Sequence, residues 1–163
     1  MIHLEKIDYR NIWDIIDLSV QEPQKEFVAS NGISLAQAYG IRDSETVAFP
    51  FAIYDDSTPV GFLMIGFNES ATYGEDAEPP RALAGNYGFW RMMIDQKYQH
   101  KGFGREAVRQ ALAFVRTWPC GRAEYCVLSY KPENTVAAKL CHSFGFVENG
   151  EKDYDEIVAV LKL

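Results

Sequence analysis

A glycine-bearing turn between a strand-like run and a helix-like run is the strongest constraint in this sequence. The turn covers residues 98–105 and reads YQHKGFGR. The run before it, residues 87–95, reads YGFWRMMID and is dense in apolar side chains, as in a buried strand. The run after it has apolar residues at helical spacing and ends at Trp118-Pro119. The sequence therefore predicts a strand, a tight turn and a helix N-terminus in direct succession.

A helix N-terminus in this position favours an anionic ligand. The first N–H groups of a helix have no partner within the helix, and the helix dipole is positive at that end. Gly102 and Gly104 allow the backbone to approach a ligand closely. From the turn alone, an ordinary strand-to-helix connection and a phosphate site remain open.

Three phosphate-binding patterns can be compared with the turn. The dinucleotide-binding pattern accepts Ala107 as its third small residue, but no acidic residue follows at a strand end about twenty residues later. The Gly-Lys-Ser/Thr of a P-loop is absent from the sequence. The third pattern fits, because Gln99-x-x-Gly102-x-Gly104 resembles the acyl-CoA pyrophosphate loop of the GNAT superfamily of acetyltransferases.

A second segment resembles the same family. It reads Asn134-x-x-Ala137-x-x-Leu140-Cys141-x-x-x-Gly145-Phe146, and many relatives carry tyrosine where this chain has Cys141. The two motifs lie in the family's order and together span residues 87–146. The resemblance implies an α/β (α+β) GNAT fold. Its mixed central sheet of about six to seven strands would splay open between the strands at 87–95 and 122–129, with about four helices flanking it.

The other segments fit this organisation. A strand is expected at 1–7, a helix at 11–20 behind an Asn11 cap, and a short helix from the capping residue Ser34 through Tyr39. Strands are expected at 51–54 and 60–67, joined by a turn at 55–59, and later at 122–128, 146–149 and 156–163. A helix between the strands at 122–128 and 146–149 is expected to begin at Asn134 and end at Gly145. The polar loop at 68–85 either covers the entrance to a substrate site or is an insertion. Such an insertion would contribute to dimer packing or have no role.

Length and composition agree with one domain, 1–163. A chain of 163 residues with 47% hydrophobic content can bury a sizeable core. No apolar run approaches the roughly 20 residues that cross a bilayer, and the charged start MIHLEKIDYR does not resemble a signal peptide. We therefore expect a soluble, cytoplasmic protein. The three cysteines and three histidines lack disulfide or metal spacing, and the composition permits a homodimer without indicating one.

The formal net charge of −7 bears on partners. Nucleic acids and anionic membranes both reward clustered Lys and Arg, so neither is expected as a partner. The charge weakly favours a cationic substrate. The alternative is that it chiefly keeps the protein soluble.

The resemblance implies acetyl-CoA as co-substrate, with no metal, and a set of residues that hold it. Backbone N–H groups of Lys101, Gly102, Phe103, Gly104 and Arg105 would bind the pyrophosphate, and the Gln99 side chain would reach the same phosphates. The charges of Lys101 and Arg105 either add to this site or are solvated. Asn134 would bond the pantetheine arm, cap its helix, or do both. Backbone N–H groups of Met93 or Ile94 would stabilise the oxyanion.

The proton route departs from the family pattern. Cys141 is either the acid that protonates the CoA thiolate or a small buried helix residue, and Tyr130 and Tyr154 are the substitutes available. No carboxylate occurs between Asn86 and Ile94, and Trp90 occupies the position at which polyamine-acetylating relatives can carry one. Deprotonation would then pass through water, or the amine would bind in its neutral form.

The acceptor class rests on the N-terminal half and the tail. Residues 20–31 and the FVENGE segment at 146–151 resemble bacterial spermine/spermidine acetyltransferases. A polyamine needs carboxylates for its ammonium groups and apolar walls for its methylenes. One wall is expected from Glu22, Glu26, Phe27 and Trp90, and another from Glu151, Asp153 and Asp155. For each carboxylate, a solvated surface charge is the alternative.

These observations favour an acetyl-CoA-dependent N-acetyltransferase acting on a small polyamine such as spermidine or spermine. A second hypothesis keeps the fold and CoA but changes the acceptor to an amino acid, an aminoglycoside or a protein N-terminus. A third is a non-catalytic CoA-binding module, prompted by the missing tyrosine and the missing strand carboxylate.

Overall fold

The computed structural model describes residues 1–42 and 44–163. Its strands are β1 (Ile2–Lys6), β2 (Val47–Asp55), β3 (Thr58–Phe67), β4 (Tyr87–Ile94), β5 (Tyr125–Tyr130), β6 (Val147–Asp153) and β7 (Glu156–Lys162). Its α-helices are α1 (Ile12–Ile16), α2 (Asn31–Gly40), α3 (Phe103–Val115) and α4 (Thr135–Ser143). Short 3-10 helices lie at η1 (Glu22–Gln24), η2 (Glu69–Thr72) and η3 (Arg81–Leu83).

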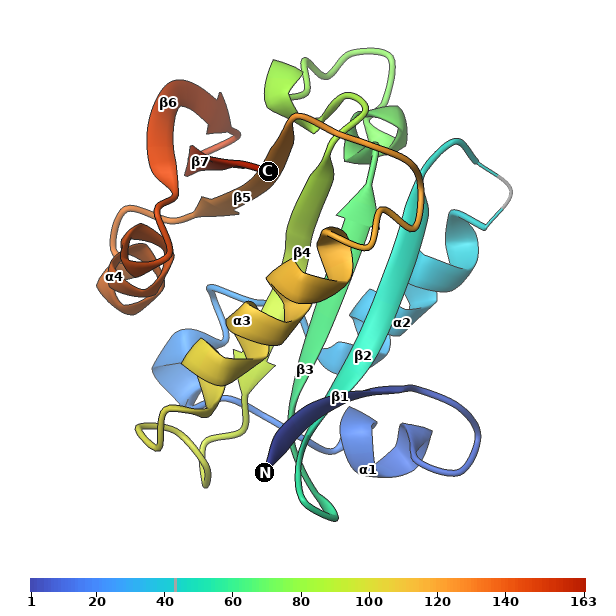
Figure 1. Cartoon of the computed structure of the whole chain (residues 1–163), viewed down its shortest axis with the longest axis vertical. Coiled ribbons are helices and arrows are strands. Elements are labelled where there is room, and N and C mark those ends of the chain that lie inside the picture. The colour runs from blue at the N-terminus through green and yellow to red at the C-terminus, as the bar shows by residue number, and fades with distance from the viewer. Residues whose placement is uncertain (43) are drawn as a thin grey trace.

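The seven strands form one mixed sheet in the order β1-β2-β3-β4-β5-β7-β6. Among the described strands only β4 and β5 pair in parallel, and they do so at two positions, Tyr87 with Cys126 and Gly88 with Val127. Beyond Gly88 the two strands diverge (Figure 1). This confirms the expected mixed sheet, its opening between these strands, and the four flanking helices.

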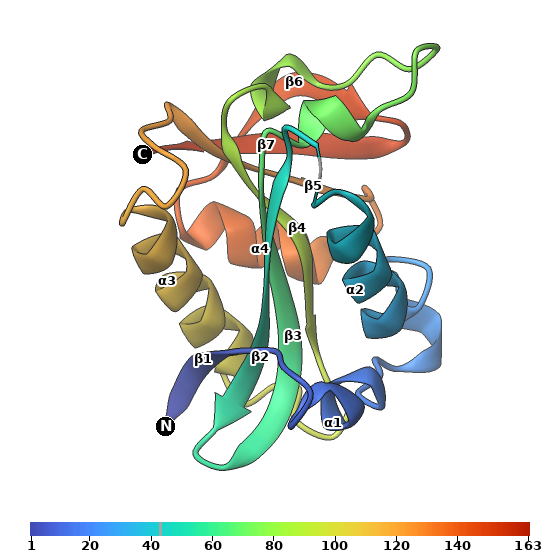
Figure 2. The same cartoon turned by 90° about the vertical axis from the view of Figure 1, so that its right-hand side faces the viewer.

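Helices cover both faces of the sheet, and the cores on the two faces differ in size. Figure 2 shows the sheet nearly edge-on, with α3 against one face and α1 and α2 against the other. The face under α3 buries Leu63, Ile65 and Tyr87 against Leu112, and α4 packs on the same core through Leu140. The opposite face is a second, smaller core. Two such layers remove both faces of the central strands from water, which is the main stabilising term for a fold of this kind.

The first helix is shorter than the sequence predicts, ending at Ile16 instead of residue 20. The Ser19 N–H donates to Asp95 Oδ2 at 2.9 Å, and Gln96 N–H donates back to Ser19 O at 2.9 Å. This exchange ties the chain to the end of β4 and takes it out of the helical path. Asn11 precedes the helix but does not cap it, because its side chain bonds to Asp8 N and Lys6 O.

The second helix begins earlier than predicted, and its cap is Ser30 instead of Ser34. The Ser30 hydroxyl accepts the Ile33 N–H at 3.3 Å. Ser34 is fully buried inside the helix, where its hydroxyl donates to Ser30 O at 3.1 Å. Serine is common at helix caps, and it is also found inside the first turn, where its hydroxyl donates to the carbonyl four residues earlier. The sequence alone therefore did not separate the two positions.

Two strands differ from expectation at their starts. β2 begins at Val47 instead of residue 51 and contains Pro50, which lies outside the stretch that pairs with β1 and so needs no N–H on that side. β5 begins at Tyr125 instead of residue 122. The Asn86 side-chain oxygen accepts the N–H groups of Glu124 and Tyr125 there, which holds the preceding residues out of the ladder. The last two strands are confirmed, although β6 continues to Asp153 beyond the expected end at residue 149, and the left-handed Gly145 (φ 91°) follows α4 as expected.

Within residues 1–42 and 44–163, none of the helices combines the length and the apolar character needed to cross a membrane.

Candidate functional site

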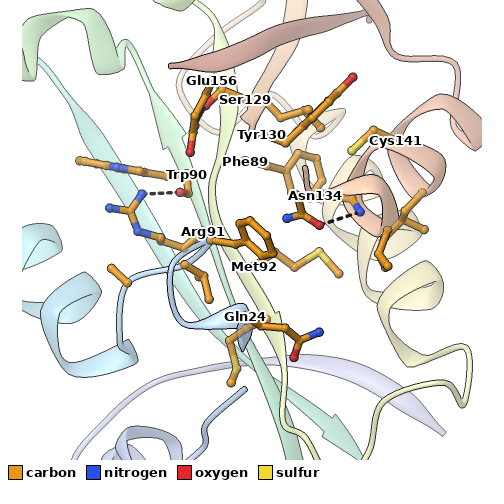
Figure 3. Close-up of a pocket in the computed structure, with 18 of the residues that line it drawn as sticks. Gln24, Phe89, Trp90, Arg91, Met92, Ser129, Tyr130, Asn134, Cys141 and Glu156 are labelled. Atoms are coloured by element: carbon orange, nitrogen blue, oxygen red, sulfur yellow. Dashed lines mark hydrogen bonds between the residues drawn. The ribbon is translucent and has the colours of Figure 1, made fainter. Parts of the chain in front are cut away.

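A cavity of about 1090 Å³ occupies the opening between β4 and β5. Its lining falls into two groups, which lie on opposite sides in Figure 3. The donor side consists of residues 98–100, 102–104, 133–137, 140 and 141, from the turn after β4 and from α4. The acceptor side consists of residues 24–29, 69–74 and 153–156, together with Trp90 and Arg91. The exposed edge of β4 runs between the two sides.

The donor side contains the glycine-bearing turn. Gly102 adopts the left-handed conformation (φ 82°) at the N-terminus of α3, where a β-carbon would be strained. A β-carbon on Gly104 would meet Met92 Cε at 3.4 Å and Leu140 Cδ2 at 3.9 Å, so a larger side chain would fill the space between the turn and α4. Gly102, Phe103 and Gly104 all line the cavity.

The Gln99 side chain is used inside the protein. Its Nε2 donates to Gln24 Oε1 at 2.8 Å and to Ile94 O at 3.0 Å, which occupies both of its hydrogens. The Gln99 amide hydrogens are therefore bonded within the protein in this structure, and the contact of this side chain with the phosphates stays a prediction. Its bonds instead tie η1 to the turn. Gln24, whose oxygen also accepts the Gln21 N–H, is a structural link that the sequence reasoning missed.

Lys101 and Arg105 are exposed, and neither is part of the cavity lining. The Lys101 ammonium lies 5.3 Å from the centre of the Tyr98 ring, and the Arg105 guanidinium lies 5.3 Å from the centre of the Phe144 ring. Both charges are thus held beside the turn by aromatic rings, within the range of a cation–π contact.

Asn134 has the cap geometry that the sequence predicted. Its side-chain oxygen accepts the Ala137 N–H at 3.2 Å, which leaves its amide nitrogen facing the cavity region seen in Figure 3. Cys141 follows two turns later on α4 and also lines the cavity. Burial raises the pKa of its thiol to about 11, so the thiol is protonated at neutral pH.

The two tyrosines considered as acids also line the cavity, and both have contacts with other side chains. The Tyr130 hydroxyl donates to Glu148 Oε1 at 2.9 Å and lies 3.3 Å from His142 Nε2. Burial and the Glu148 bond raise its pKa to about 12. Tyr154 is 79% exposed and stacks on Tyr73 with ring centres 6.1 Å apart. Of the three candidate acids, Cys141 is the one that lies on α4, beside the turn after β4.

Alternation along β4 separates the two backbone candidates for the oxyanion. The Asp95 N–H donates to Val60 O on the β3 side, while Ile94 O faces the opposite side and accepts from Gln99. Along a strand, the N–H and C=O groups of successive residues point to opposite sides. Ile94 and Met92 therefore direct their N–H groups to the open edge, and Met93 directs its N–H to β3. Met93 is therefore excluded as a donor into the opening, and its side chain is 94% buried in the core under α1 and α2 (relative exposure 6%).

The acceptor side brings together Trp90, Phe27 and Glu26, three of the four residues predicted for one wall. Trp90 lies at a bulge, because Met64 pairs with Arg91 and Ile65 with Phe89. The fourth residue, Glu22, does not belong to this wall: it is 83% exposed and its carboxylate pairs with Lys25 Nζ at 2.6 Å. Glu26 lines the cavity and Glu22 does not.

The turn between β6 and β7 supplies the opposite wall. Asp153, Asp155 and Glu156 line the cavity. Asp153 accepts a hydrogen bond from Tyr73 at 2.7 Å, and Ser129 donates to Glu156. Glu151, also predicted here, instead accepts the N–H groups of Arg81 and Ala82 and fixes η3. The 68–85 loop is thus part of the cavity, which supports its interpretation as a cover over a substrate mouth.

Two acceptor-side residues were missed in the sequence. Glu69 begins η2 and is 91% buried. Arg91 follows the bulge, and its buried Nε has no hydrogen-bond partner among residues 1–42 and 44–163. Arg91 Nη1 donates to Trp90 O at 2.7 Å and Nη2 to Gln37 Oε1 at 3.2 Å. Two glycines inside strands, at 66 and 88, were the available sequence clue, since such glycines often mark a close approach.

The lining is strongly acidic. Its side chains include six carboxylates (Glu26, Glu69, Glu133, Asp153, Asp155, Glu156) against two cationic groups (Lys25, Arg91), besides His100. Five of the six carboxylates belong to the acceptor side. Among the described residues, no group of three or more His, Cys, Asp or Glu side chains is arranged to hold a metal ion.

Solved structures share this fold. A spermidine N-acetyltransferase from Vibrio cholerae, in complex with CoA and spermine, superposes with a TM-score of 0.66 at 17% identity, covering 99% of this chain and 94% of the other. An aminoglycoside acetyltransferase in complex with coenzyme A gives a TM-score of 0.74 at 14% identity, covering 99% and 95%.

Sequence relatives point the same way. A spermine/spermidine N(1)-acetyltransferase of Bacillus subtilis (strain 168) is 28% identical over 155 residues, which is 94% of this chain and 93% of the relative. The family model described as Acetyltransferase (GNAT) family matches residues 8–146, which include the turn after β4, the capped α4 and Gly145-Phe146. This chain therefore belongs to the GNAT family of acetyltransferases.

Proposed function

We propose that this acetyltransferase moves the acetyl group of acetyl-CoA directly to a primary amine of a small polyamine resembling spermidine or spermine. The observation that carries the proposal is the acidic acceptor side, where carboxylates from η2, the 24–29 segment and the β6–β7 turn face one cavity. Trp90 and Phe27 add flat apolar surface for a methylene chain. The relatives named as spermine/spermidine acetyltransferases support the same acceptor.

The donor side has the parts that acetyl-CoA would require. The N–H groups at the start of α3, after left-handed Gly102, would hold the pyrophosphate. The open edge of β4, with the N–H groups of Met92 and Ile94, would bond the pantetheine amides and the thioester oxygen. The Asn134 amide nitrogen would bond the same arm from α4, and the Cys141 thiol would lie beside the departing sulfur.

Thiol release from acetyl-CoA tests the proposal across a panel of amines. The panel contains spermine, spermidine, lysine, kanamycin and a peptide with a free N-terminus. We expect saturable turnover with spermine or spermidine. No stimulation by any polyamine at millimolar concentration contradicts the proposed acceptor, and binding of acetyl-CoA without turnover on any amine supports the non-catalytic alternative.

An aminoglycoside is the strongest competing acceptor, because it is also polycationic and would find the same acidic wall. A variant separates wall charge from general damage. Asp153→Asn removes a carboxylate next to Tyr73, and we expect it to raise the KM for spermine about 3- to 10-fold, since a partly exposed ion pair contributes of the order of 1 kcal/mol. The KM for acetyl-CoA should stay unchanged. The matched control is Asp76→Asn. Asp76 is an exposed residue of the 68–85 loop and is not part of the cavity lining.

A further inference from the structure

Glu69 occupies space that two strand glycines leave for it. Gly66 in β3 and Gly88 in β4 are paired across the two strands, and Glu69 lies over both. A β-carbon on Gly66 would lie 2.5 Å from Glu69 Oε1, and one on Gly88 would lie 2.4 Å from the same oxygen. These separations are far below contact distance, so the carboxylate sits where any side chain at either position would be.

The carboxylate is buried without a hydrogen bond from the described residues, although the charge of Arg91 favours its ionised form. Only 9% of Glu69 is exposed, and in the part of the chain that the structure describes no hydrogen-bond donor reaches its side chain. A buried carboxyl in this condition costs folding free energy that an apolar group of the same size would not. Its remaining exposure is to the cavity, whose lining it joins. A structural role therefore does not account for it.

Its place along β4 relates it to the proposed reaction. Gly88 is the last residue of β4 that pairs with β5, so Glu69 lies at the closed end of the opening. The turn that would hold the pyrophosphate lies at the other end, and β4 rises by roughly 20 Å between Gly88 and Ile94. An extended pantetheine arm anchored at the turn would run along this edge toward Glu69. The acceptor side meets the edge from the face that carries Trp90 and Arg91.

We propose that Glu69 is the general base that takes a proton from the acceptor ammonium, an inference that rests on the acetyl transfer proposed above. The ammonium gives one proton to the Glu69 carboxylate and becomes a neutral amine. The amine nitrogen attacks the thioester carbon, the C–N bond forms and the C–S bond breaks. A second proton of that nitrogen passes to the departing thiolate, and Glu69 returns its own proton to water. The sum is amide, free CoA thiol and one proton released.

The charges around Glu69 suit this step. Burial raises its pKa, Arg91 of β4 opposes this rise and Asp153 of β6 adds to it, and the net result is a pKa of about 8. Tyr73, directly after η2, and Cys126 of β5 also interact with it, and burial raises the pKa of each. A base with a pKa near the working pH is the most effective. A bound ammonium favours the ionised carboxylate, so the entering substrate would itself prepare the base.

Glu69→Gln tests the assignment because it keeps shape and removes the base. We expect kcat with the best polyamine to fall about 100-fold and the rising limb near pH 8 in kcat/KM to disappear. Glu69→Asp should recover part of the rate and retain a limb. Acetyl-CoA affinity, measured by calorimetry, should match wild type and shows that the variant is folded. Glu75→Gln, an exposed glutamate a few residues away, is the matched control. A raised KM for the amine with kcat and the pH limb unchanged overturns the assignment.

Failure of the acceptor proposal has a different signature. If wild type acetylates kanamycin, lysine or a peptide in place of polyamines, the acceptor is wrong, and the same Glu69→Gln comparison with that amine decides the role of Glu69. If wild type binds acetyl-CoA and acetylates no amine in the panel, both the proposed function and the role of Glu69 are overturned.

Discussion

The donor and acceptor sides of the cavity are built in different ways. The donor side comes from two short segments, 98–104 and 133–141, each held by its own backbone: a left-handed glycine before α3 and an asparagine cap before α4. The acceptor side comes from three segments, 24–29, 69–74 and 153–156, which are far apart in the chain. Its residues are held by contacts between elements, such as Tyr73 with Asp153.

The difference shows where a family resemblance is informative. A turn or cap depends on neighbours in sequence, so a motif carries its geometry with it. A wall assembled from several elements depends on strand pairing and side-chain burial. The donor side therefore accounts for membership of the family, while the acceptor side decides what the protein acetylates. Variants on each side should affect different measurements.

The largest effect is expected from Gly104→Trp on the donor side. The indole would fill the space toward Met92 and Leu140 that the pantetheine arm is proposed to cross. We expect CoA binding, measured by calorimetry, to weaken more than 100-fold, or about 3 kcal/mol. Gly40→Trp is the control, because Gly40 is exposed and its β-carbon would meet nothing within 4 Å. Retained CoA affinity in Gly104→Trp would place the donor elsewhere.

Gly66→Ala should damage the acceptor side alone. Its new methyl group would meet only Glu69 atoms at close range, at 2.5 to 2.7 Å, and would push that side chain off β3. We expect turnover to fall roughly 10- to 100-fold with CoA affinity unchanged. Overpacking should also cost about 1–3 kcal/mol of stability. Gly32→Ala, where a β-carbon meets nothing within 4 Å, is the control. Full activity in Gly66→Ala would mean that the position of Glu69 is not important for turnover.

The stability of the fold should also depend on Glu69 through pH. Its pKa is raised from 4.5 unfolded to about 8 folded, so the folded state binds this proton more tightly. The resulting stability is fully present below about pH 4.5 and is lost as pH rises through about 8. Glu69→Gln lacks this loss, and urea unfolding at pH 6 and pH 9 should show a fall smaller than wild type by about 1–3 kcal/mol. Equal falls in the two proteins would show that the carboxyl is not buried as described.

The smallest effect is expected from Cys141→Ala on the donor side. The thiol packs on the core beneath α4, and its pKa of about 11 makes it a weak proton donor at neutral pH. We expect kcat to fall less than about threefold and stability to fall by about 1 kcal/mol. Cys120→Ala, a half-buried cysteine away from the cavity, is the control. A fall of tenfold or more that grows with pH would instead identify Cys141 as the acid.

Particular residues show which parts of the site could be predicted from the sequence. The turn at Gly102 and Gly104 and the cap at Asn134 were predicted correctly as local structure, because each depends on the backbone next to it. The contacts of the Gln99 and Glu22 side chains were not predicted, since they depend on how η1 packs against the turn after β4. Ser30 and Ser34 lie four residues apart, and the structure shows that Ser30 is the one that caps α2.

What the sequence determined by itself was the donor side: a strand, a glycine turn, a helix and a capped second helix, each encoded by residues close together in the chain. What only the tertiary structure decided was the chemistry of the acceptor side. Glu69 becomes a buried carboxylate with a raised pKa because β3 and β4 pair Gly66 with Gly88 beneath it and bring Arg91 and Asp153 near it. Burial and charge depend on distance in space, and no spacing along this chain contains that information.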